Sequence, residues 1–188
     1  ALTRSHYLLE GVAEAEDGVV TVQTSNQQLS VKLKAQPLPS AVVDLLTKEE
    51  ALLLQLYEAR TSNITSALSE TARAFFERLQ ATFAEAGKEW AGTEQRIVAF
   101  GPRHCGPNVI MTSDATSEIA PFFADYFAAV AGDTALVEAS VHVRNADAAA
   151  LMSAQARNVD LGFQMVSGNG PVAEEPMVGV GFVIVDMV

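Results

Sequence analysis

Apolar residues in this chain change their spacing from one segment to the next, and the change restricts the folds that it can adopt. Between Leu29 and Gln36 apolar and polar residues alternate, which is the period of a half-buried strand. The proline-rich run 37–39 ends that strand, since proline has no amide hydrogen to give to a β-ladder. From residue 40 to 86 the apolar residues recur at helical spacing instead. The sequence therefore predicts a strand that leads directly into helices.

Residues 40–86 are predicted to form a helical hairpin. Ser40 is a candidate cap for the first helix, and Thr47 with Glu50 has the spacing of a capping box at which this helix restarts or bends. A polar break at residues 61–63 separates it from a second helix. The apolar face of that second helix consists of Ile64, Leu68, Phe75, Leu79 and Phe83. We expect this face to belong to the core rather than to line a cofactor groove.

The rest of the chain mixes strands and helices. Short or alternating apolar runs predict strands at residues 19–23, 96–100, 109–112, 135–143 and 178–188. Helices are predicted at residues 117–130 and 146–166, the second with Gly162 in its interior, where a glycine often marks close packing. Because strands and helices do not alternate strictly, the sequence predicts an α+β two-layer sandwich that includes the helical hairpin.

Composition narrows the class of protein. The 188 residues are 49% apolar and 19% charged, which is typical of a single globular domain spanning residues 1–188. No apolar run predicts a membrane span. The formal charge of −11 argues against a surface that neutralises DNA or RNA phosphates throughout, so any RNA contact must be local. The lone Cys105 excludes an internal disulfide and favours a reducing, cytoplasmic location.

Both ends of the sequence are expected to be internal to a longer chain. The first four residues have neither an initiator methionine nor the apolar core of a signal peptide. The apolar run 178–188 finishes without a stop signal. We therefore expect a parent protein that continues beyond Val188.

The loop Gly101–Asn108 has the glycine spacing of a phosphate-binding loop. Such a loop needs a lysine and a hydroxyl residue to hold phosphate and magnesium, and Pro107 and Asn108 stand in their places. Two glycines and two prolines fix the shape of the loop instead. We expect no nucleotide to bind there.

Cys105 is the candidate for nucleophilic catalysis, with His104 or His142 as its base, because a thiolate is a strong nucleophile at neutral pH. Adjacent residues of an extended loop point apart, however, and nothing in the sequence places His142 nearby. A packed, inert thiol is the alternative that we favour over a small cysteine-dependent enzyme. His6, His104, Cys105 and His142 also lack the short ligand spacings of a zinc site.

Glu174 and Glu175 are candidates for an acid and base pair. They precede Pro176, and neighbouring carboxylates at such a place more often cap or line a turn. We therefore expect no catalytic, cofactor-binding or metal-binding residue in this chain, and a binding or structural module is the leading class.

Positive charges that stand out on this acidic chain form a candidate contact surface for RNA or protein. They are Lys32, Lys34, Arg96, Arg103 and His104. The alternative is that each is an ordinary solvated charge.

Two sequence blocks carry a family resemblance. Residues 96–110 contain Phe-Gly-Pro and Gly-Pro-Asn and resemble the signature of the fourth domain of eukaryotic and archaeal translocase factors. Residues 162–180 resemble the end of the same domain and follow in the same order. The residues that carry the motifs are Phe100, Gly101, Pro102, Gly106, Pro107, Asn108, Gly162, Phe163, Gln164, Glu174, Glu175 and Gly179.

Within that superfamily the chain is most similar to the elongation-factor-like GTPases that mature the large ribosomal subunit. Residues 35–39, Arg103 with Cys105, and residues 174–176 carry this preference. The resemblance implies a fold similar to the second domain of ribosomal protein S5, including a left-handed crossover. It also implies a ribosome-facing domain of a cytoplasmic GTPase that takes part in ribosome biogenesis.

The partners implied by the resemblance are the large ribosomal subunit, with its RNA and protein, a docking protein and an anti-association factor, which the GTPase releases. GTP and magnesium would bind in another domain of the parent, and neither DNA nor a membrane is implied. The rival within the superfamily is the fourth domain of the elongation translocase, which acts in tRNA–mRNA translocation. That domain carries a modified histidine on a loop that would lie beyond Val188.

Overall fold

The computed structural model describes residues 12–14, 18–23, 30–113, 119–128, 146–171 and 174–187. The predicted strand at residues 135–143, and both His6 and His142, lie outside the described residues. Of the predicted helix at residues 117–130 the structure describes residues 119–128, and only Ala124–Ala128 are helical.

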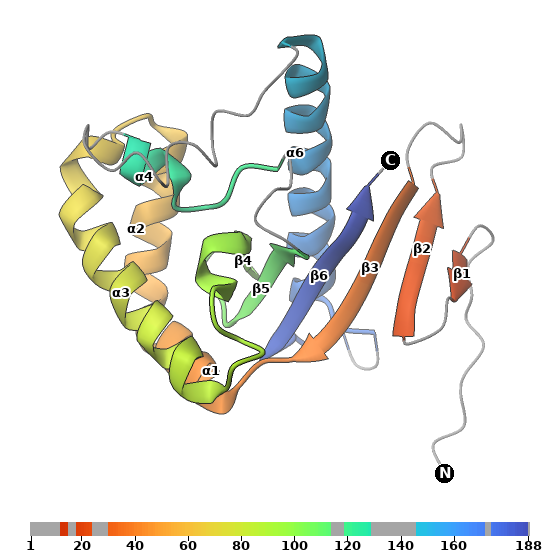
Figure 1. Ribbon diagram of the computed structural model, residues 1–188, viewed down its shortest axis with the longest axis horizontal. Helices are drawn as coiled ribbons and strands as arrows, with labels where there is room; N and C mark the ends of the chain where they lie inside the picture. The colour runs from red at the N-terminus through yellow and green to blue at the C-terminus, as the bar shows by residue number, and fades with distance from the viewer. Residues whose placement is uncertain are drawn as a thin grey trace.

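The described strands form one mixed sheet in the order β1-β2-β3-β6-β5-β4 (Figure 1). β5 and β6 are parallel, and every other neighbouring pair is antiparallel. β6 lies between β3 and β5, so this strand joins strands from the two halves of the chain. The bounds are β1 Val12–Glu14, β2 Val19–Gln23, β3 Ser30–Pro37, β4 Ile97–Gly101, β5 Asn108–Thr112 and β6 Val180–Met187.

Helices cover both faces of the β4–β5 end of this sheet (Figure 1). Within residues 40–86, α1 (Ser40–Lys48), α2 (Glu50–Thr61), the 3₁₀ turn η2 (Thr65–Leu68) and α3 (Ser69–Ala86) form the helical hairpin. A second 3₁₀ turn, η3 (Thr93–Arg96), leads into β4, and the short α4 (Ala124–Ala128) packs against α3. α6 (Ala146–Gly168) lies on the other face.

Side chains of β4 and β5 point to both faces of the sheet and so contribute to two separate hydrophobic cores. Phe100, Val109 and Met111 enter the core beneath the helical hairpin. Ala99 and Ile110 point to the opposite face, where Phe163 of α6 meets them. All ten residues of the two strands are buried, as expected for strands covered on both sides. The α+β prediction is confirmed, and the helical hairpin forms a further layer at this end of the sheet.

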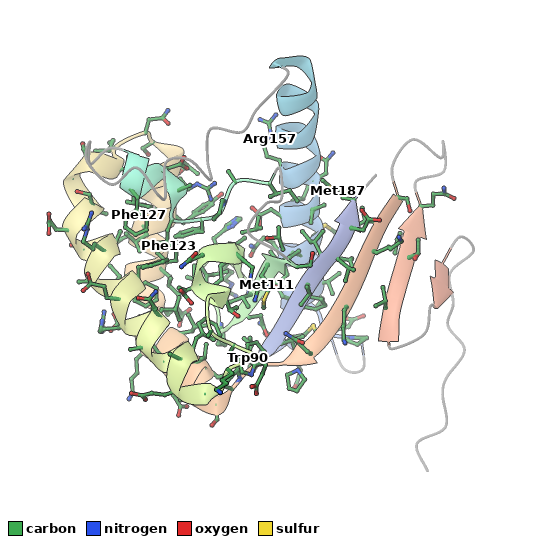
Figure 2. All side chains as sticks on the ribbon, viewed as in Figure 1. Trp90, Met111, Phe123, Phe127, Arg157 and Met187 are labelled. Carbon is green, nitrogen blue, oxygen red and sulfur yellow. The ribbon has the colours of Figure 1, made fainter. Side chains whose placement is uncertain are left out.

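An aromatic group joins α4 to the helical hairpin. Phe123 and Phe127, both labelled in Figure 2, meet Phe76 of α3 edge-on at ring-centroid distances of 5.2 and 5.1 Å. Phe122 packs in the same way on Phe100 of β4 at 5.0 Å. These contacts fix the helical hairpin onto the sheet.

The first helix breaks where the sequence predicted, but the capping predictions were wrong. α1 ends at Lys48 and α2 begins at Glu50. Thr47 does not cap α2, because its hydroxyl donates back to the carbonyl oxygen of Val43 at 2.8 Å. Ser40 is the first helical residue rather than the cap, and Pro39 occupies the N-cap position without a side-chain hydrogen bond.

None of the described helices combines the length and the apolar character needed to cross a lipid bilayer.

Candidate functional site

The loop between β4 and β5 is a turn with an unusual backbone conformation. The Gly101–Pro102 peptide is cis, and Arg103 and His104 have left-handed φ angles of 58° and 62°. The amides of Cys105 and Gly106 both donate to the carbonyl oxygen of Pro102, at 3.3 and 2.9 Å. Two successive non-glycine residues in the left-handed region are unusual, and such outliers concentrate at functional sites.

The two glycines of the loop are required by close contacts. A β-carbon on Gly101 would lie 2.7 Å from the ring of Phe163 and 2.8 Å from the hydroxyl of Ser167, both on α6. A β-carbon on Gly106 would lie 2.6 Å from the carbonyl oxygen of Gly101. Neither position has room for a side chain, so the Gly-Pro repeat of the motif is a packing requirement.

Asn108 joins this loop to the segment that precedes β6. Its side-chain amide donates to the carbonyl oxygens of Gly101 at 3.0 Å and Met177 at 2.7 Å. Its side-chain oxygen accepts from the amide of Val180 at 2.9 Å. The amide of Gly179, which has a φ of 76°, donates to the carbonyl oxygen of Pro107 at 3.2 Å. Asn108 is fully buried, so these bonds are shielded from water.

Gln164 of α6 makes the corresponding connection on the other side of the loop. Its amide nitrogen donates to the carbonyl oxygen of Phe100 at 2.8 Å, and its oxygen accepts from the backbone amide of His104 at 2.9 Å. The two motif blocks that the sequence separates therefore meet in space. Most motif residues, including Phe100, Gly101, Asn108, Phe163 and Gln164, build the scaffold of the loop.

His104 is held between two elements. Its ring stacks on Tyr57 of α2 with centroids 3.8 Å apart and planes 3° apart. Its Nδ1 is buried without a hydrogen-bond partner among the described residues, and the Asp160 carboxylate lies 3.7 Å away. Burial lowers the pKa of His104 from its usual value, and the charge of Asp160 opposes this shift in part. The neutral ring is thus the form that the folded protein favours.

Cys105 does not have the surroundings of a nucleophile. It is only 4% exposed, and its thiol faces the Glu50 carboxylate at 3.7 Å. Burial raises the pKa of the Cys105 thiol, and the charge of Glu50 raises it further. The ring of His104 stacks on Tyr57, and the hydrogen bonds of the thiol go to Glu50 and to the carbonyl oxygen of Pro102 instead. These contacts favour the packed, inert thiol.

The predicted basic residues do not form one patch. Arg96 is used inside the fold, where it donates to the carbonyl oxygens of Thr112 and Ser113 at 3.2 and 2.7 Å. Arg96 and Arg103 lie at opposite ends of β4. Arg103 is exposed at the tip of the loop, beside the half-buried His104. Of the five predicted contact residues, only Arg103 and His104 therefore lie together on the loop.

Lys32 and Lys34 lie on β3, away from the loop. They share the face opposite to the one on which Val31 and Leu33 pack, as the alternation predicted. Lys32 forms an ion pair with Asp186 of β6 at 2.9 Å, and its side chain is 45% exposed. The neighbouring carboxylate reduces the local positive charge of this pair.

Glu174 and Glu175 form a turn, as the alternative to catalysis predicted. The amide of Glu174 donates to the carbonyl oxygen of Gly170, and the amide of Gly170 donates to that of Glu175, at 3.1 and 2.9 Å. Both side chains are exposed. Among the described residues, no three histidine, cysteine or carboxylate side chains are grouped so that they could hold a metal ion.

Tyr57, Asp160, Ser167 and Met177 also contribute to the site but were missed in the sequence analysis. Ser167 and Met177 lie inside the second motif block, so the resemblance gave a signal for both. Tyr57 lies on a helix whose apolar pattern predicts a core position, and no local signal connects it to His104, which stands 47 residues later in the sequence. Contacts of this kind arise only from the packing of distant elements.

Comparisons with known proteins agree with the motifs. A family model described as the elongation factor-like GTPase 1-like domain matches residues 34–113. Elongation factor-like GTPase 1 of Mus musculus is 28% identical over 184 residues, and that of Homo sapiens is 28% identical over 188 residues. Each alignment covers 93% of this chain and 15% of the relative. The chain is therefore similar, over 93% of its length, to a part of elongation factor-like GTPase 1.

Proposed function

We propose that this chain is a ribosome-contacting unit, equivalent to the fourth domain of the translocase factors, within a cytoplasmic GTPase that matures the large ribosomal subunit. The family match, the alignments over 93% of the chain and the two motif blocks support this proposal. GTP and magnesium would bind in another part of the parent protein. The partners would be the large subunit, the docking protein and the anti-association factor that the parent releases.

The observation that carries the proposal is the exposed Arg103 on a loop that cannot easily change shape. Its neighbours on both sides are held by the Asn108 and Gln164 hydrogen bonds. A guanidinium on a rigid turn can meet a phosphate or carboxylate without a large loss of conformational entropy. Arg103 would thus make a local contact on a chain whose overall charge of −11 repels nucleic acid.

Mechanically, the unit would act as a stiff arm. The sheet is covered on both faces at the β4–β5 end, and the contact loop is anchored to α6 and to the segment before β6. A rearrangement driven by nucleotide hydrolysis elsewhere could then displace the arm as a rigid body. Displacement of the arm against a bound factor requires no catalytic residue in this chain.

The test uses the whole parent protein and purified precursors of the large subunit. Asparagine tolerates left-handed φ angles, so Arg103→Asn should keep the loop while removing the charge. Binding measured over a series of salt concentrations should weaken, and the slope of log K against log salt should fall by about 0.7 for each RNA phosphate that the variant no longer neutralises. Lys48→Gln, a change of an exposed lysine on the helical hairpin, is the matched control and should leave the slope unchanged.

Lys32 and Lys34 are tested separately, because they lie on a different part of the sheet. Replacing both lysines by glutamine should reduce the same slope if this surface also meets RNA. An unchanged slope in the double variant would remove β3 from the contact surface. An unchanged slope in Arg103→Asn would contradict the proposal itself.

A further inference from the structure

Gln164 of α6 makes three hydrogen bonds that converge beside the β4–β5 loop. Its Oε1 accepts from the backbone amide of His104 at 2.9 Å. Its Nε2 donates to the carbonyl oxygen of Phe100 at 2.8 Å, and also to the Asp160 carboxylate, one turn earlier on α6, at 2.9 Å. Gln164 therefore bonds the backbone on both sides of Arg103, the exposed residue of the loop.

Asp160 decides which way round the Gln164 amide group lies. The two ends of an amide group have nearly the same shape, but only the NH2 group donates and only the oxygen accepts. A carboxylate only accepts, so the Gln164 side chain turns its NH2 group toward Asp160. Its oxygen then faces the backbone amide of His104. Residues four apart share one side of a helix, so α6 itself keeps Asp160 beside Gln164.

The backbone at Arg103 and His104 needs this support. Both residues have left-handed φ angles, of 58° and 62°, which cost free energy in any residue except glycine. The His104 amide is bonded to Gln164, and the next two amides of the loop are bonded to the carbonyl oxygen of Pro102. The loop would therefore meet a phosphate with the Arg103 side chain rather than with a cradle of backbone amides.

The outward side of α6 takes no part in this support. Leu161 and Met165 are 62% and 64% exposed. A β-carbon added at Gly162 would meet nothing within 4 Å. The expectation that Gly162 marks close packing is therefore wrong for the described part of the chain. Support for the loop comes from the side of α6 that carries Gln164 and Phe163, which face β4.

We propose that Gln164, oriented by Asp160, is a positioning residue for Arg103. It holds the loop backbone in the conformation from which the guanidinium meets an RNA phosphate, so that little ordering is left to be done on binding. Gln164 acts through the backbone of His104 and does not itself contact RNA. The inference rests on the proposed function, in which Arg103 makes the phosphate contact.

A double-mutant cycle on the whole parent protein tests this role. Gln164→Ala should weaken binding to purified precursors of the large subunit by about tenfold, because the loop must then be ordered on binding. The slope of log K against log salt should stay unchanged, because Arg103 still neutralises its phosphate in the complex. In the Arg103→Asn background, Gln164→Ala should weaken binding by less than about twofold, since the side chain that it positions is already gone.

Further variants separate positioning from a general loss of stability. Gln164→Glu keeps an acceptor for the His104 amide but sets two carboxylates side by side, so it should weaken binding as Gln164→Ala does. Adding Asp160→Asn supplies an NH2 group to the new carboxylate and should raise the affinity again by at least about threefold. Gln55→Ala removes an exposed glutamine from α2, and as the matched control it should bind as the unchanged protein does.

The order of the loop backbone provides a second readout, which needs no RNA. Relaxation of ¹⁵N in the chain should give backbone order parameters of about 0.85 at Arg103 and His104. In Gln164→Ala these values should fall below about 0.6, while the rest of β4 and β5 stays rigid. Gln55→Ala should leave the order parameters of the loop unchanged.

Equal weakening by Gln164→Ala with and without Arg103→Asn would overturn the inference, because Gln164 would then act independently of Arg103. A loop that stays rigid in Gln164→Ala would overturn it as well. Both results leave the proposed function standing, provided that Arg103→Asn alone lowers the salt slope. An unchanged slope in Arg103→Asn contradicts the proposed function, and the inference with it.

Discussion

Asn108 shows how a single side chain can explain a sequence motif. Its amide group makes three hydrogen bonds, to Gly101, Met177 and Val180, at a position that is fully buried. Aspartate cannot donate the first two bonds, and any shorter residue leaves all three backbone groups unpaired. The motif thus ends in asparagine because the joint between β4, β5 and β6 needs both donors and an acceptor.

Asn108→Ala should therefore lower the free energy of unfolding by about 3 kcal/mol, because it leaves several buried backbone groups without partners. Urea unfolding of the chain, followed by circular dichroism, measures the change. Asn169→Ala is the matched control, since its side chain bonds the Met165 carbonyl oxygen in an exposed position, and it should stay within about 0.5 kcal/mol. A similar loss in both variants would show that Asn108 has no special role.

His104 makes stability depend on pH. The folded protein favours the neutral ring, whereas the unfolded chain takes up a proton near the usual pKa of 6.5. Below that pH the unfolded state binds more protons than the folded state, so acid favours unfolding. The stabilisation is present above pH 6.5 and is lost as the pH falls toward the lowered pKa of the folded state.

His104→Phe keeps a ring to stack on Tyr57 but removes the titrating group. Urea unfolding between pH 7.5 and 5 should show that the unchanged chain loses more stability than the variant as the pH falls. Parallel curves for the two proteins would mean that His104 does not contribute to the acid sensitivity.

At the scale of elements, α6 has two faces with opposite requirements. The inward face carries Phe163 and Ser167, which press against Gly101 of β4. The outward face carries Gly162 and large exposed apolar residues. The apolar spacing of α6 does not show that Gly101 is crowded by this helix while Gly162 has open space beside it. The distinction depends on where the sheet lies.

A pair of alanine substitutions tests this contrast. Gly101→Ala should destabilise the chain by about 1–3 kcal/mol, because the new methyl group would overlap Phe163 and Ser167. Gly162→Ala should stabilise it by about 0.5–1 kcal/mol, because its β-carbon meets nothing and alanine favours the helix. Thermal and urea unfolding of the two variants measure both changes. The same sign for both would contradict the placement of α6.

At the scale of the whole molecule, burial is uneven across the sheet. β4 and β5 are buried along their entire length, whereas β2 is half-buried or exposed. β1 pairs only with β2 among the described strands, so that side of the sheet is less well covered. Stability should therefore increase from β2 toward β4.

Hydrogen exchange followed by mass spectrometry should reproduce this gradient. Peptides covering residues 97–112 should exchange slowest, at a rate close to that set by global unfolding, because helices cover both faces of these strands. Peptides covering residues 19–23 should exchange at least about tenfold faster through local opening. Equal protection in both regions would show that the sheet opens as a single unit.

Much of the fold could be predicted from the chain alone, because the period of the apolar residues is a local property. It placed β2, β3, α6 and the helical hairpin, and it put Lys32 and Lys34 on one face of β3. The capping predictions at Ser40 and Thr47 were wrong, because a short polar side chain can bond to the nearest carbonyl oxygen instead. Arg96 was grouped with Arg103 because both are positively charged. Charge does not show that β4 separates the two residues.

The sequence by itself determined most of the described helices and strands, the α+β class and the family resemblance of this chain, since each depends on residues that are close together or in fixed order. Only the tertiary structure decided that Asn108 meets residues 69 and 72 positions away, and that His104 stacks on Tyr57. It also decided that Gly101 is crowded while Gly162 is open. The physical reason is that such contacts depend on how whole elements pack, and no local pattern of side chains records that arrangement.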